Sequence, residues 1–292
     1  MNKQLCIFGE VLFDVFPDGH QVLGGAPFNV AWHLQAFDQA PFFISRVGND
    51  AEGIQVRKTM LDWGMDTRAL QTDDSLSTGR VQIELDDGEP SYDIIEPCAF
   101  DNIDKTSELD SCSLLYHGSL ALRNNQSKKA FQQLLLSRPS LVFVDVNLRS
   151  PWWKKETLLE TLKHAHWVKL NTGELDLLYP SGKATKERLS SFMNEYCLEG
   201  IVLTHGDKGA EMLTANNEHY TVEPTKITQI QDTVGAGDAF SSIVIMGLKN
   251  NWLLSDTLER AQQFASAIVQ NRGAIVNDKS FYIDFMKTWE IA

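Results

Sequence analysis

Short, almost uniformly apolar runs alternate along this chain with longer amphipathic runs, and this alternation constrains the fold more than any other feature. The apolar runs span residues 4–16, 41–47, 113–118, 141–147, 166–171 and 200–206. Amphipathic runs of helix length lie near residues 27–37, 51–64, 126–138, 153–165, 184–197, 235–249 and 255–271. Strands that are apolar on both faces are covered by helices on both sides. The sequence therefore predicts an α/β fold with a largely parallel central sheet.

Polar residues gather at the ends of several predicted strands. In an open parallel sheet, ligands bind outside the carboxyl ends of the strands. The polar residues at these ends are Asp14, Asp145, Asn147, Asn171 and Thr204. Asp14 is expected to end the first strand, which would place its carboxylate at that edge. We expect a binding site there.

Residues 77–97 interrupt this rhythm. Val81, Ile83 and Leu85 alternate with polar neighbours, and Asp87 with Gly88 is typical of a hairpin turn. The pattern predicts two antiparallel strands, which form either a small lid inserted into the parallel architecture or an ordinary edge hairpin. Unpaired strand edges often pair with a second subunit or are kept short, so the sequence leaves the oligomeric state open and a homodimer is one possibility.

Composition limits the class of protein. The chain has 292 residues, enough for one large domain, and no apolar run approaches the roughly 18–20 residues of a membrane helix. Its apolar start carries Glu10 and Asp14 and lacks a small-residue cleavage site, which indicates a buried strand and not a signal peptide. Four scattered cysteines without a CxxC pair indicate reduced thiols in a cytoplasmic protein.

Charge limits the class of partner. The formal net charge of −13 argues against nucleic-acid binding, which depends on a basic face. The acidity does not exclude a phosphate ligand, because local amides and a cation can hold an anion on an acidic protein.

The segment DTVGAGDAF (232–240) combines glycines with a carboxylate. Gly235 and Gly237 fall between an extended stretch and an apolar helical run, where backbone amides and the helix dipole form a cradle for an anion. The alternative is a glycine-rich turn in which Asp238 starts the helix, a position that favours Asp. No GxxxxGK[ST] loop occurs in the chain, so a Walker A site is excluded.

Five blocks of sequence resemble the signatures of one enzyme family. GAGDAF after Asp-Thr resembles the C-terminal signature of the ribokinase-like (PfkB) carbohydrate kinases, and GGAPFNVAWHLQAF (24–37) with VGNDAEG (47–53) resembles the N-terminal one. The remaining blocks, in the family's order, are DVNLR (145–149), NTGE (171–174) and THGDKGA (204–210). Together they cover nearly the whole chain, and GE-x-L-x-D near its start is most similar to the fructokinase branch.

The resemblance implies a ribokinase-like three-layer sandwich, with a single domain over residues 1–292 and a small β lid formed around 10–24 and 77–100. It also implies an ATP-dependent kinase that transfers the γ-phosphate to a sugar hydroxyl, most similar to a fructokinase. Ribose, 2-keto-3-deoxygluconate and other sugars or sugar acids stay open as substrates. A non-catalytic relative that binds sugar or nucleotide is a further alternative, and the presence of Asp238 argues against it.

By the same resemblance, Asp238 is the general base that takes a proton from the attacking sugar hydroxyl. The backbone amides expected to form an anion hole for the transferred group are those of Val234, Gly235, Ala236 and Gly237. These roles are physically consistent, because phosphoryl transfer needs positioning and electrostatic stabilisation more than covalent chemistry.

The resemblance also implies a sugar site. Its expected residues are Asp14, Gly24, Gly25, Asn29, Asn147 and Arg149. Glycines let a sugar approach the backbone closely, and the planar donors of Arg149 suit a phosphate. The structural alternatives are a solvated strand end for Asp14, a polar helix start for Asn29 and a surface ion pair for Arg149. Tyr92 and Phe100 are candidate lid contacts.

The nucleotide and cation site follows from the same blocks. Its expected nucleotide-binding residues are Asn171, Thr204, Gly206, Gly209, Gly235, Gly237 and Asn271. Glu174 is expected to hold Mg²⁺ through water, and Asp232 to lie beside K⁺. Asn171 with Glu174 also matches a capping box, and Gly206 with Gly209 also suits a turn between antiparallel strands. The final segment, residues 270–281, departs from the family pattern and leaves the K⁺ site open.

Two further pairs are interpreted as structural. His164 and His166 lack a third metal ligand of matching character. Trp152 and Trp153 are expected to pack against the core.

Overall fold

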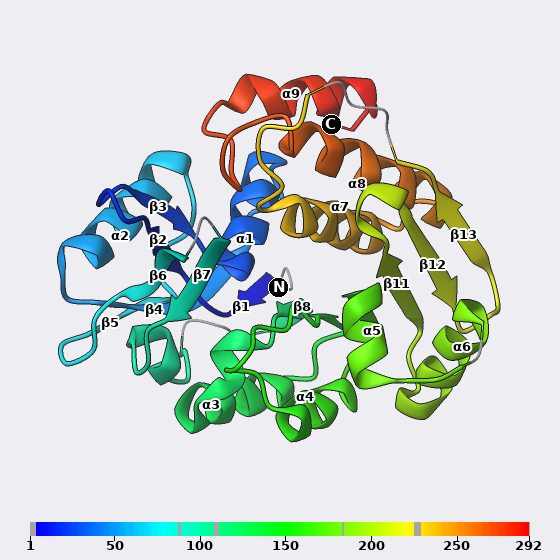
Figure 1. The fold of residues 1–292 in the computed structure, drawn as a ribbon, viewed down its shortest axis with the longest axis horizontal. Helices are drawn as coiled ribbons and strands as arrows, with labels where there is room; N and C mark the ends of the chain where they lie inside the picture. The colour runs from blue at the N-terminus through cyan, green and yellow to red at the C-terminus, as the bar shows by residue number, and fades with distance from the viewer. Residues whose placement is uncertain (1–3, 87–88, 108–110, 183, 225–228, 292) are drawn as a thin grey trace.

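Within the described residues, 4–86, 89–107, 111–182, 184–224 and 229–291, the computed structural model contains a nine-stranded sheet in the order β13-β12-β11-β10-β9-β8-β1-β4-β5 (Figure 1). Its strands are β1 (Gln4–Phe8), β4 (Phe42–Gly48), β5 (Leu70–Asp73), β8 (Cys112–His117), β9 (Leu141–Asp145), β10 (Trp167–Asn171), β11 (Gly200–Thr204), β12 (Ala210–Thr214) and β13 (His219–Val222). Neighbours from β5 to β11 pair in parallel, and β12 and β13 pair antiparallel. The predicted largely parallel sheet is confirmed.

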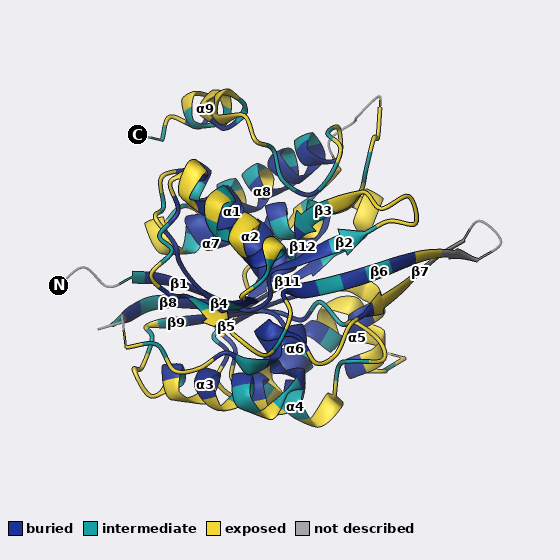
Figure 2. Ribbon diagram, turned by 90° about the vertical axis from the view of Figure 1, so that its left-hand side faces the viewer, coloured by how far each residue is buried: buried dark blue, intermediate teal, exposed yellow. Residues whose placement is uncertain are grey.

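Helices cover both faces of this sheet and make a three-layer sandwich (Figure 2). One face carries α1 (Ala26–Ala36), α2 (Ala51–Trp63), α7 (Ala236–Asn250), α8 (Leu254–Ile268) and α9 (Lys279–Thr288). The other carries α3 (Asn125–Leu135), α4 (Lys155–Leu162), α5 (Thr172–Leu178) and α6 (Thr185–Tyr196). All seven predicted helices are present near their predicted bounds, whereas β5 and α9 were not predicted because their runs are short or weakly periodic, and α5 was indicated only by the capping box of Asn171 and Glu174. None of the helices in the described part of the chain is both long and apolar enough to cross a membrane.

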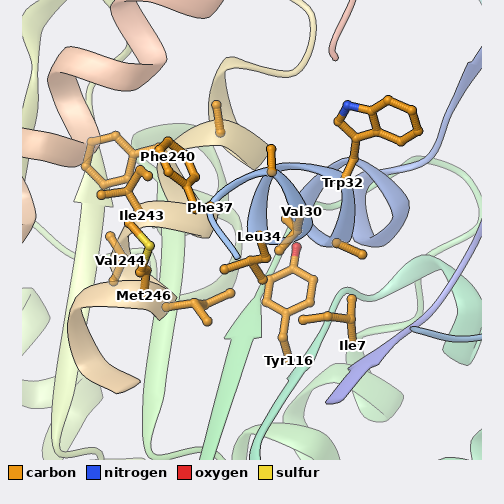
Figure 3. Close-up of a cluster of buried hydrophobic side chains, with 14 of the residues drawn as sticks. Ile7, Val30, Trp32, Leu34, Phe37, Tyr116, Phe240, Ile243, Val244 and Met246 are labelled. Atoms are coloured by element: carbon orange, nitrogen blue, oxygen red, sulfur yellow. The ribbon is translucent and has the colours of Figure 1, made fainter. Parts of the chain in front are cut away.

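Two apolar cores fill the spaces between the layers. In β1, Leu5 and Ile7 point into the core beneath α1 and α7, while Cys6 and Phe8 point into the core above α3 and α4. This alternation, with both sides buried, explains why the strands have almost no polar residues. Figure 3 shows α7 contributing Phe240 and Ile243 to the first core.

A second sheet lies beside the sandwich and, in the described part of the chain, has four strands in the order β3-β2-β6-β7 (Figures 1 and 2). They are β2 (Leu12–Val15), β3 (Gln21–Gly24), β6 (Gly79–Asp86) and β7 (Glu89–Ile94). The predicted pair of antiparallel strands is confirmed as β6 and β7. The turn predicted at Asp87 and Gly88 lies outside the described residues.

The prediction of one strand over residues 4–16 is wrong. β1 ends at Phe8, and the chain then crosses to the small sheet as β2. A Cβ on Gly9 would lie 2.4 Å from Pro27 Cγ, so the chain crosses tightly against the start of α1. Asp14 therefore belongs to the small sheet, opposite Val22, and does not end a strand of the central sheet. An apolar pattern that continues across a crossing cannot show where one sheet is left for another.

Polar contacts anchor the small sheet to the sandwich. Asp50 caps α2 by accepting the Gly53 amide at 2.8 Å, and its other oxygen accepts the amide of Thr78, just before β6, also at 2.8 Å. The Thr78 hydroxyl donates to Asp50 at 2.6 Å and accepts the Gly48 amide at 3.0 Å. The segment VGNDAEG thus joins β4 and α2 to the base of the small sheet.

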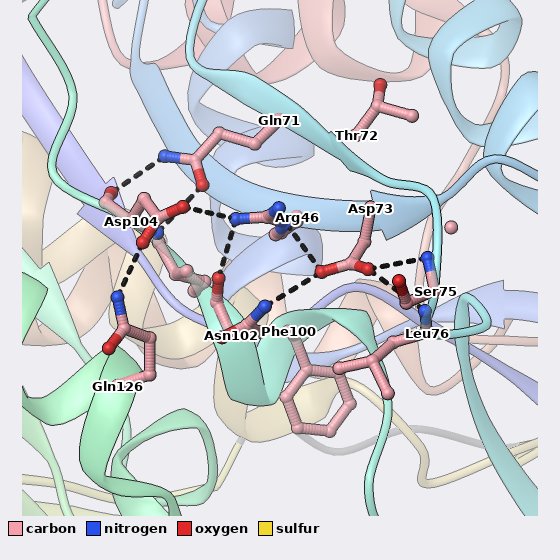
Figure 4. A network of polar contacts seen from close by, with 12 residues as sticks. Arg46, Gln71, Thr72, Asp73, Ser75, Leu76, Phe100, Asn102, Asp104 and Gln126 are labelled. Atoms are coloured by element: carbon pink, nitrogen blue, oxygen red, sulfur yellow. Dashed lines mark hydrogen bonds and ion pairs between the residues drawn. The ribbon is translucent and has the colours of Figure 1, made fainter.

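A second polar network fixes the neighbouring edge of the central sheet (Figure 4). Arg46 on β4 pairs with Asp73 at 2.9 Å and with Asp104 at 2.6 Å. Asn102 donates to the same Asp73 at 2.9 Å. The 3₁₀ turn η1 (Ala99–Asn102), which follows β7, is thereby held against β4 and β5.

Candidate active site

Asp238 lies in the first turn of α7, and this helix packs beside α1 (Figure 1). Asn29 on α1 is 4% exposed, and its Nδ2 donates to Asp238 Oδ2 at 2.8 Å. Burial raises the pKa of Asp238 to about 6, the Asn29 hydrogen bond opposes that rise, and the charge of Asp145 adds to it. The carboxylate therefore stays ionised at neutral pH but is more basic than an exposed Asp.

Asp14, Gly24 and Asn29 meet beside this carboxylate. A Cβ on Gly24 would lie 3.7 Å from Asp14 Oδ2 and 3.9 Å from Asn29 Oδ1. Asn29 Oδ1 is buried and has no hydrogen-bond partner within the described residues. Two oxygen acceptors therefore flank the bare Gly24 backbone, an arrangement that suits a ligand with neighbouring hydroxyl groups.

Gly25 and Glu10 close this part of the site. Gly25 has a φ of 110°, and a Cβ there would lie 2.8 Å from the Glu10 carbonyl oxygen, so only glycine fits. Glu10 is 3% exposed, and burial raises its pKa to about 7. Burial likewise raises the pKa of Asp14 to about 6. Sequence reasoning missed Glu10, although a carboxylate within an apolar run was visible.

The loop after β9 carries Asn147 and Arg149. Asn147 has a left-handed φ of 35°, and its carbonyl accepts a hydrogen bond from Ser119 at 3.1 Å. Arg149 is exposed, and its charge lowers the pKa of both Asp14 and Asp238. The guanidinium therefore lies close enough to interact with both carboxylates.

The loop before Asp238 has the geometry of an anion cradle. Gly235 has a φ of 79°, and a Cβ there would lie 2.4 Å from Ala274 Cβ. Val234 donates its amide to Asp232 at 3.0 Å, and the Ala236 amide reaches the Thr233 carbonyl only at 3.4 Å. The 15-residue helix α7 starts here, and the first amides of a helix lack acceptors within it. These amides and the helix dipole favour a bound anion.

Lys169 lies beneath this loop and was also missed from the sequence. It is on β10, is 6% exposed and pairs with Asp145 at 2.7 Å. A Cβ on Gly237 would lie 3.4 Å from its Nζ. A lysine between Val168 and Leu170 in a buried strand was the available signal.

Asn171 and Glu174 form the capping box that was weighed as the structural alternative. Asn171 Oδ1 accepts the Glu174 amide at 2.9 Å, and Glu174 Oε2 accepts the Asn171 amide at 2.8 Å. Glu174 Oε1 also accepts the Leu148 amide at 2.8 Å, which ties α5 to the loop of Asn147 and Arg149. Burial raises the pKa of Glu174. Each oxygen keeps a lone pair, so the residue fits Mg²⁺ held through water better than a direct bond.

Thr204, Gly206 and Gly209 lie where β11 turns back into β12. Thr204 is in register with Asn171 on the neighbouring strand. Gly206 and Gly209 have φ values of 62° and 89°, and a Cβ on Gly209 would lie 2.0 Å from the Val222 carbonyl oxygen. The turn between antiparallel strands thus accounts for both glycines, and the same turn borders the ends of β10 and β11.

Asp232 and Asn271 lie on the other side of the cradle. Asp232 Oδ2 accepts the Gly273 amide at 3.0 Å, which joins the loop before α7 to the segment after α8. The Asn271 side chain donates to the Ala267 carbonyl at 2.9 Å and closes the end of α8. No group of three or more His, Cys, Asp or Glu side chains suited to a metal occurs among the described residues.

Three secondary expectations have clear outcomes. His166 Nδ1 accepts the Val142 amide at 2.9 Å, and Trp152 and Trp153 pack against a core, as expected of structural residues. Tyr92 is 58% exposed on β7. Phe100 is fully buried and packs beneath the Arg123 guanidinium at 5.0 Å, so its interpretation as a lid contact is wrong.

Known proteins resemble this chain along nearly its whole length. Residues 6–280 match the pfkB family carbohydrate kinases. The fructokinase of Escherichia coli is 29% identical over 292 residues, covering 94% of this chain and 93% of its own length. The aminoimidazole riboside kinase of Salmonella typhimurium is 25% identical, covering 94% and 91%.

A solved structure shows the same fold. It is a double-mutant fructokinase from Vibrio cholerae O395 in a form with fructose, ADP and potassium ion bound. The TM-score is 0.81 at 26% identity, covering 96% of this chain and 97% of that one. The chain belongs to the pfkB family of carbohydrate kinases, has the ribokinase-like fold and is a sugar kinase.

Proposed function

We propose that this enzyme transfers the γ-phosphate of ATP to a hydroxyl group of fructose. The observation that carries the proposal is the pair of Asn29 and Asp238, joined at 2.8 Å between the acceptors around Gly24 and the start of α7. A sugar hydroxyl at that point would have a base on one side and an anion cradle on the other. The fructokinases among the relatives, and the fructose and ADP bound to one of them, support this substrate pair.

The chain's own residues divide the reaction between them. Asp238 accepts the proton of the attacking hydroxyl, a contribution of typically 10²–10⁴-fold. The amides of Gly235, Ala236 and Gly237 and the dipole of α7 stabilise the charge that develops on the transferred group. Asp14, Gly24, Gly25, Asn29 and Asn147 orient the sugar, and Arg149 holds a phosphoryl oxygen.

The nucleotide and cations are assigned to the neighbouring loops. We assign ATP to a set comprising Asn171, Thr204, Gly206, Gly209 and Asn271. Glu174 fits Mg²⁺ through water, and the ion would neutralise phosphate charge when bound. Asp232 and the segment after α8 are the proposed K⁺ site, supported by their direct contact and by the potassium ion in the Vibrio cholerae protein.

The small sheet is proposed as a lid on a single domain. It carries Asp14 and Gly24, and it meets the sandwich at the sugar site. Within the described residues its outer strands, β3 and β7, each have one edge without a partner strand, which supports pairing with a second copy in a homodimer.

A second candidate is the same reaction on another sugar. The aminoimidazole riboside kinase among the relatives favours this alternative, because it covers nearly the whole chain and is named for a riboside and not for fructose. A pocket built on hydrogen bonds can discriminate strongly between sugars that differ by one hydroxyl group.

The test is a panel of sugars with ATP and Mg²⁺, followed by ADP release. We expect fructose to give the highest kcat/KM, and ADP release without sugar to stay near background. A higher kcat/KM for ribose or a sugar acid would show that this compound, and not fructose, is the preferred substrate. No turnover on any sugar, despite tight ATP binding, would refute the kinase and favour a binding protein.

A further inference from the structure

A buried ion pair lies directly beneath the first turn of α7. Lys169 Nζ is 2.7 Å from Asp145 Oδ2, and both side chains are buried. Ser241 Oγ on α7 is 2.7 Å from the same Asp145 oxygen and 3.0 Å from the Gly237 carbonyl, so its proton is shared between them. Lys169 also abuts Gly237 from below. The pair is therefore connected to the glycine loop at two points.

Stability alone does not explain this pair. Removing two charges from water costs as much as their attraction returns, and well-packed apolar residues often replace such pairs without loss. Trp167, two residues before Lys169 on the same face of β10, is apolar and buried in the core beneath α1 and α7. An apolar residue at 169 would suit the strand equally well, so the charges are better explained by what lies above them.

We propose that Lys169 and Asp145 are positioning residues for phosphoryl transfer, which hold the first turn of α7 through Ser241 and fix the balance of charge around Asp238. The inference rests on the proposed function, in which Asp238 is the base. It assigns the pair no contact with the sugar. The pair acts on the reaction through the loop and through the proton affinity of the base.

Several charged or titratable groups face Asp238 from the elements around it. They are Glu10 after β1, Tyr116 on β8, Asp145 on β9, Arg149 in the loop after β9, and Lys169 on β10. α1 contributes the neutral Asn29. Within this set, Asp145 raises the pKa of Asp238 and Lys169 lowers it, so the two partners oppose each other. Removing the charge of Asp145 should therefore lower the pKa of Asp238, and removing the charge of Lys169 should raise it.

The experiment is the pH profile of kcat/KM in the wild type, Asp145→Asn and Lys169→Gln. Asp145→Asn is nearly isosteric, and Lys169→Gln removes the charge and leaves a shorter side chain with an amide donor. We expect the midpoint of the acid limb to move to lower pH by about 1 unit in Asp145→Asn. In Lys169→Gln we expect it to move to higher pH by about 1 unit. In Ser241→Ala, which removes a hydrogen bond but no charge, we expect the limb to stay and kcat to fall about fivefold.

The opposite shifts of the acid limb in the two charge variants distinguish a positioning role from a purely structural one. General loosening of the fold would lower kcat in both charge variants without moving their limbs in opposite senses. Lys169→Arg keeps the charge and is the matched control, with an acid limb expected at the wild-type position. If Asp145→Asn fails to fold, the comparison of Lys169→Gln with Lys169→Arg decides.

Two failures are distinguishable. Unmoved limbs, or limbs that move in the same direction, in an active wild-type background would overturn the inference and leave the kinase function standing. A wild type that phosphorylates no sugar would refute the function itself.

Discussion

Two carboxylates, the buried Glu174 and the half-buried Asp238, lie at the same edge of the central sheet but are held differently. Glu174 accepts backbone amides on both oxygens, from Asn171 at 2.8 Å and Leu148 at 2.8 Å. Among the described residues, the donor to the Asp238 carboxylate is one side chain, Asn29, at 2.8 Å. A carboxylate tied to two backbone segments fixes loops, whereas one held by a single amide side chain keeps an oxygen for a ligand. The contacts of Glu174 therefore suit a structural role, whereas those of Asp238 suit the role of base that we propose for it.

Replacing Asp238 tests the chemical half of this comparison and has the largest expected effect. In Asp238→Asn we expect turnover to fall by about 10²–10⁴-fold, because the base is lost. ATP affinity and the Tm should change little, since an amide is similar in size and carries no buried charge. Kinetics, ATP titration and thermal unfolding check the three quantities. Asp284→Asn, at a position on α9 whose side chain is 79% exposed, is the control and should match the wild type.

Glu10 extends the comparison to a carboxylate whose Oε2 has no partner among the described residues. Its pKa in the folded state is raised from 4.5 to about 7, so the folded state binds the proton more tightly than the unfolded chain. The resulting stabilisation is complete below the unfolded pKa and is lost as pH rises through the folded pKa. Glu10→Gln should therefore be more stable than the wild type at pH 8, by up to about 3 kcal/mol, and equal to it at pH 4.

Denaturant unfolding at the two pH values measures this difference. A stability gain in Glu10→Gln that is the same at pH 4 and pH 8 would contradict the raised pKa. A loss at both would show that the ionised carboxylate has a partner in the folded protein.

Replacing Glu174 tests the structural half. In Glu174→Gln an NH₂ group replaces one of the two carboxylate oxygens. That group cannot accept a hydrogen bond, so the backbone amide of either Asn171 or Leu148 loses its acceptor. We expect a loss of about 1–3 kcal/mol in the free energy of unfolding and a lower Tm. An unchanged Tm would show that the hydrogen bonds of Glu174 to Asn171 and Leu148 do not stabilise the fold. The comparison sharpens if Asp238→Asn lowers turnover alone while Glu174→Gln lowers the Tm.

The pH dependence of the wild type has the smallest expected effect. In the proposed function Asp238 is the base, and burial raises its pKa to about 6, so we expect kcat/KM to fall tenfold per pH unit below that value. The pKa of Asp14 is raised to a similar value, and its protonation would steepen the limb. A rate that stays constant down to pH 4.5 would be incompatible with an Asp238 base in this environment.

The sequence predicted the central architecture because both-sided burial leaves a clear apolar pattern in the strands. It failed at residues 4–16, where the chain passes from one sheet to another and only Gly9 and Glu10 interrupt the apolar pattern. It also missed α9, which lacks a clear period, and it recognised α5 only through the capping box of Asn171 and Glu174. The fold class could be predicted from the sequence. The sheet to which each strand belongs could not, because it depends on contacts between residues far apart in the chain.

The candidate site was predicted where motifs fix the backbone. Asn29, Gly24 and Asp238 were expected together and lie together, although Asn29 and Asp238 are 209 residues apart in sequence. Lys169 and Glu10 were missed because a single charged residue in an apolar run reveals nothing of its partner. Phe100 was misplaced because an aromatic residue beside the predicted hairpin suits a lid and a core equally well.

The most direct test of the central claim is ³¹P NMR of ATP and fructose with the wild-type enzyme and with Asp238→Asn. The wild type should convert the γ-phosphate signal into a sugar-phosphate signal at the rate at which ADP forms, and Asp238→Asn should do so about 10²–10⁴-fold more slowly. Equal rates in both proteins, or inorganic phosphate in place of sugar phosphate, would contradict the assignment of Asp238 as the base of a sugar kinase.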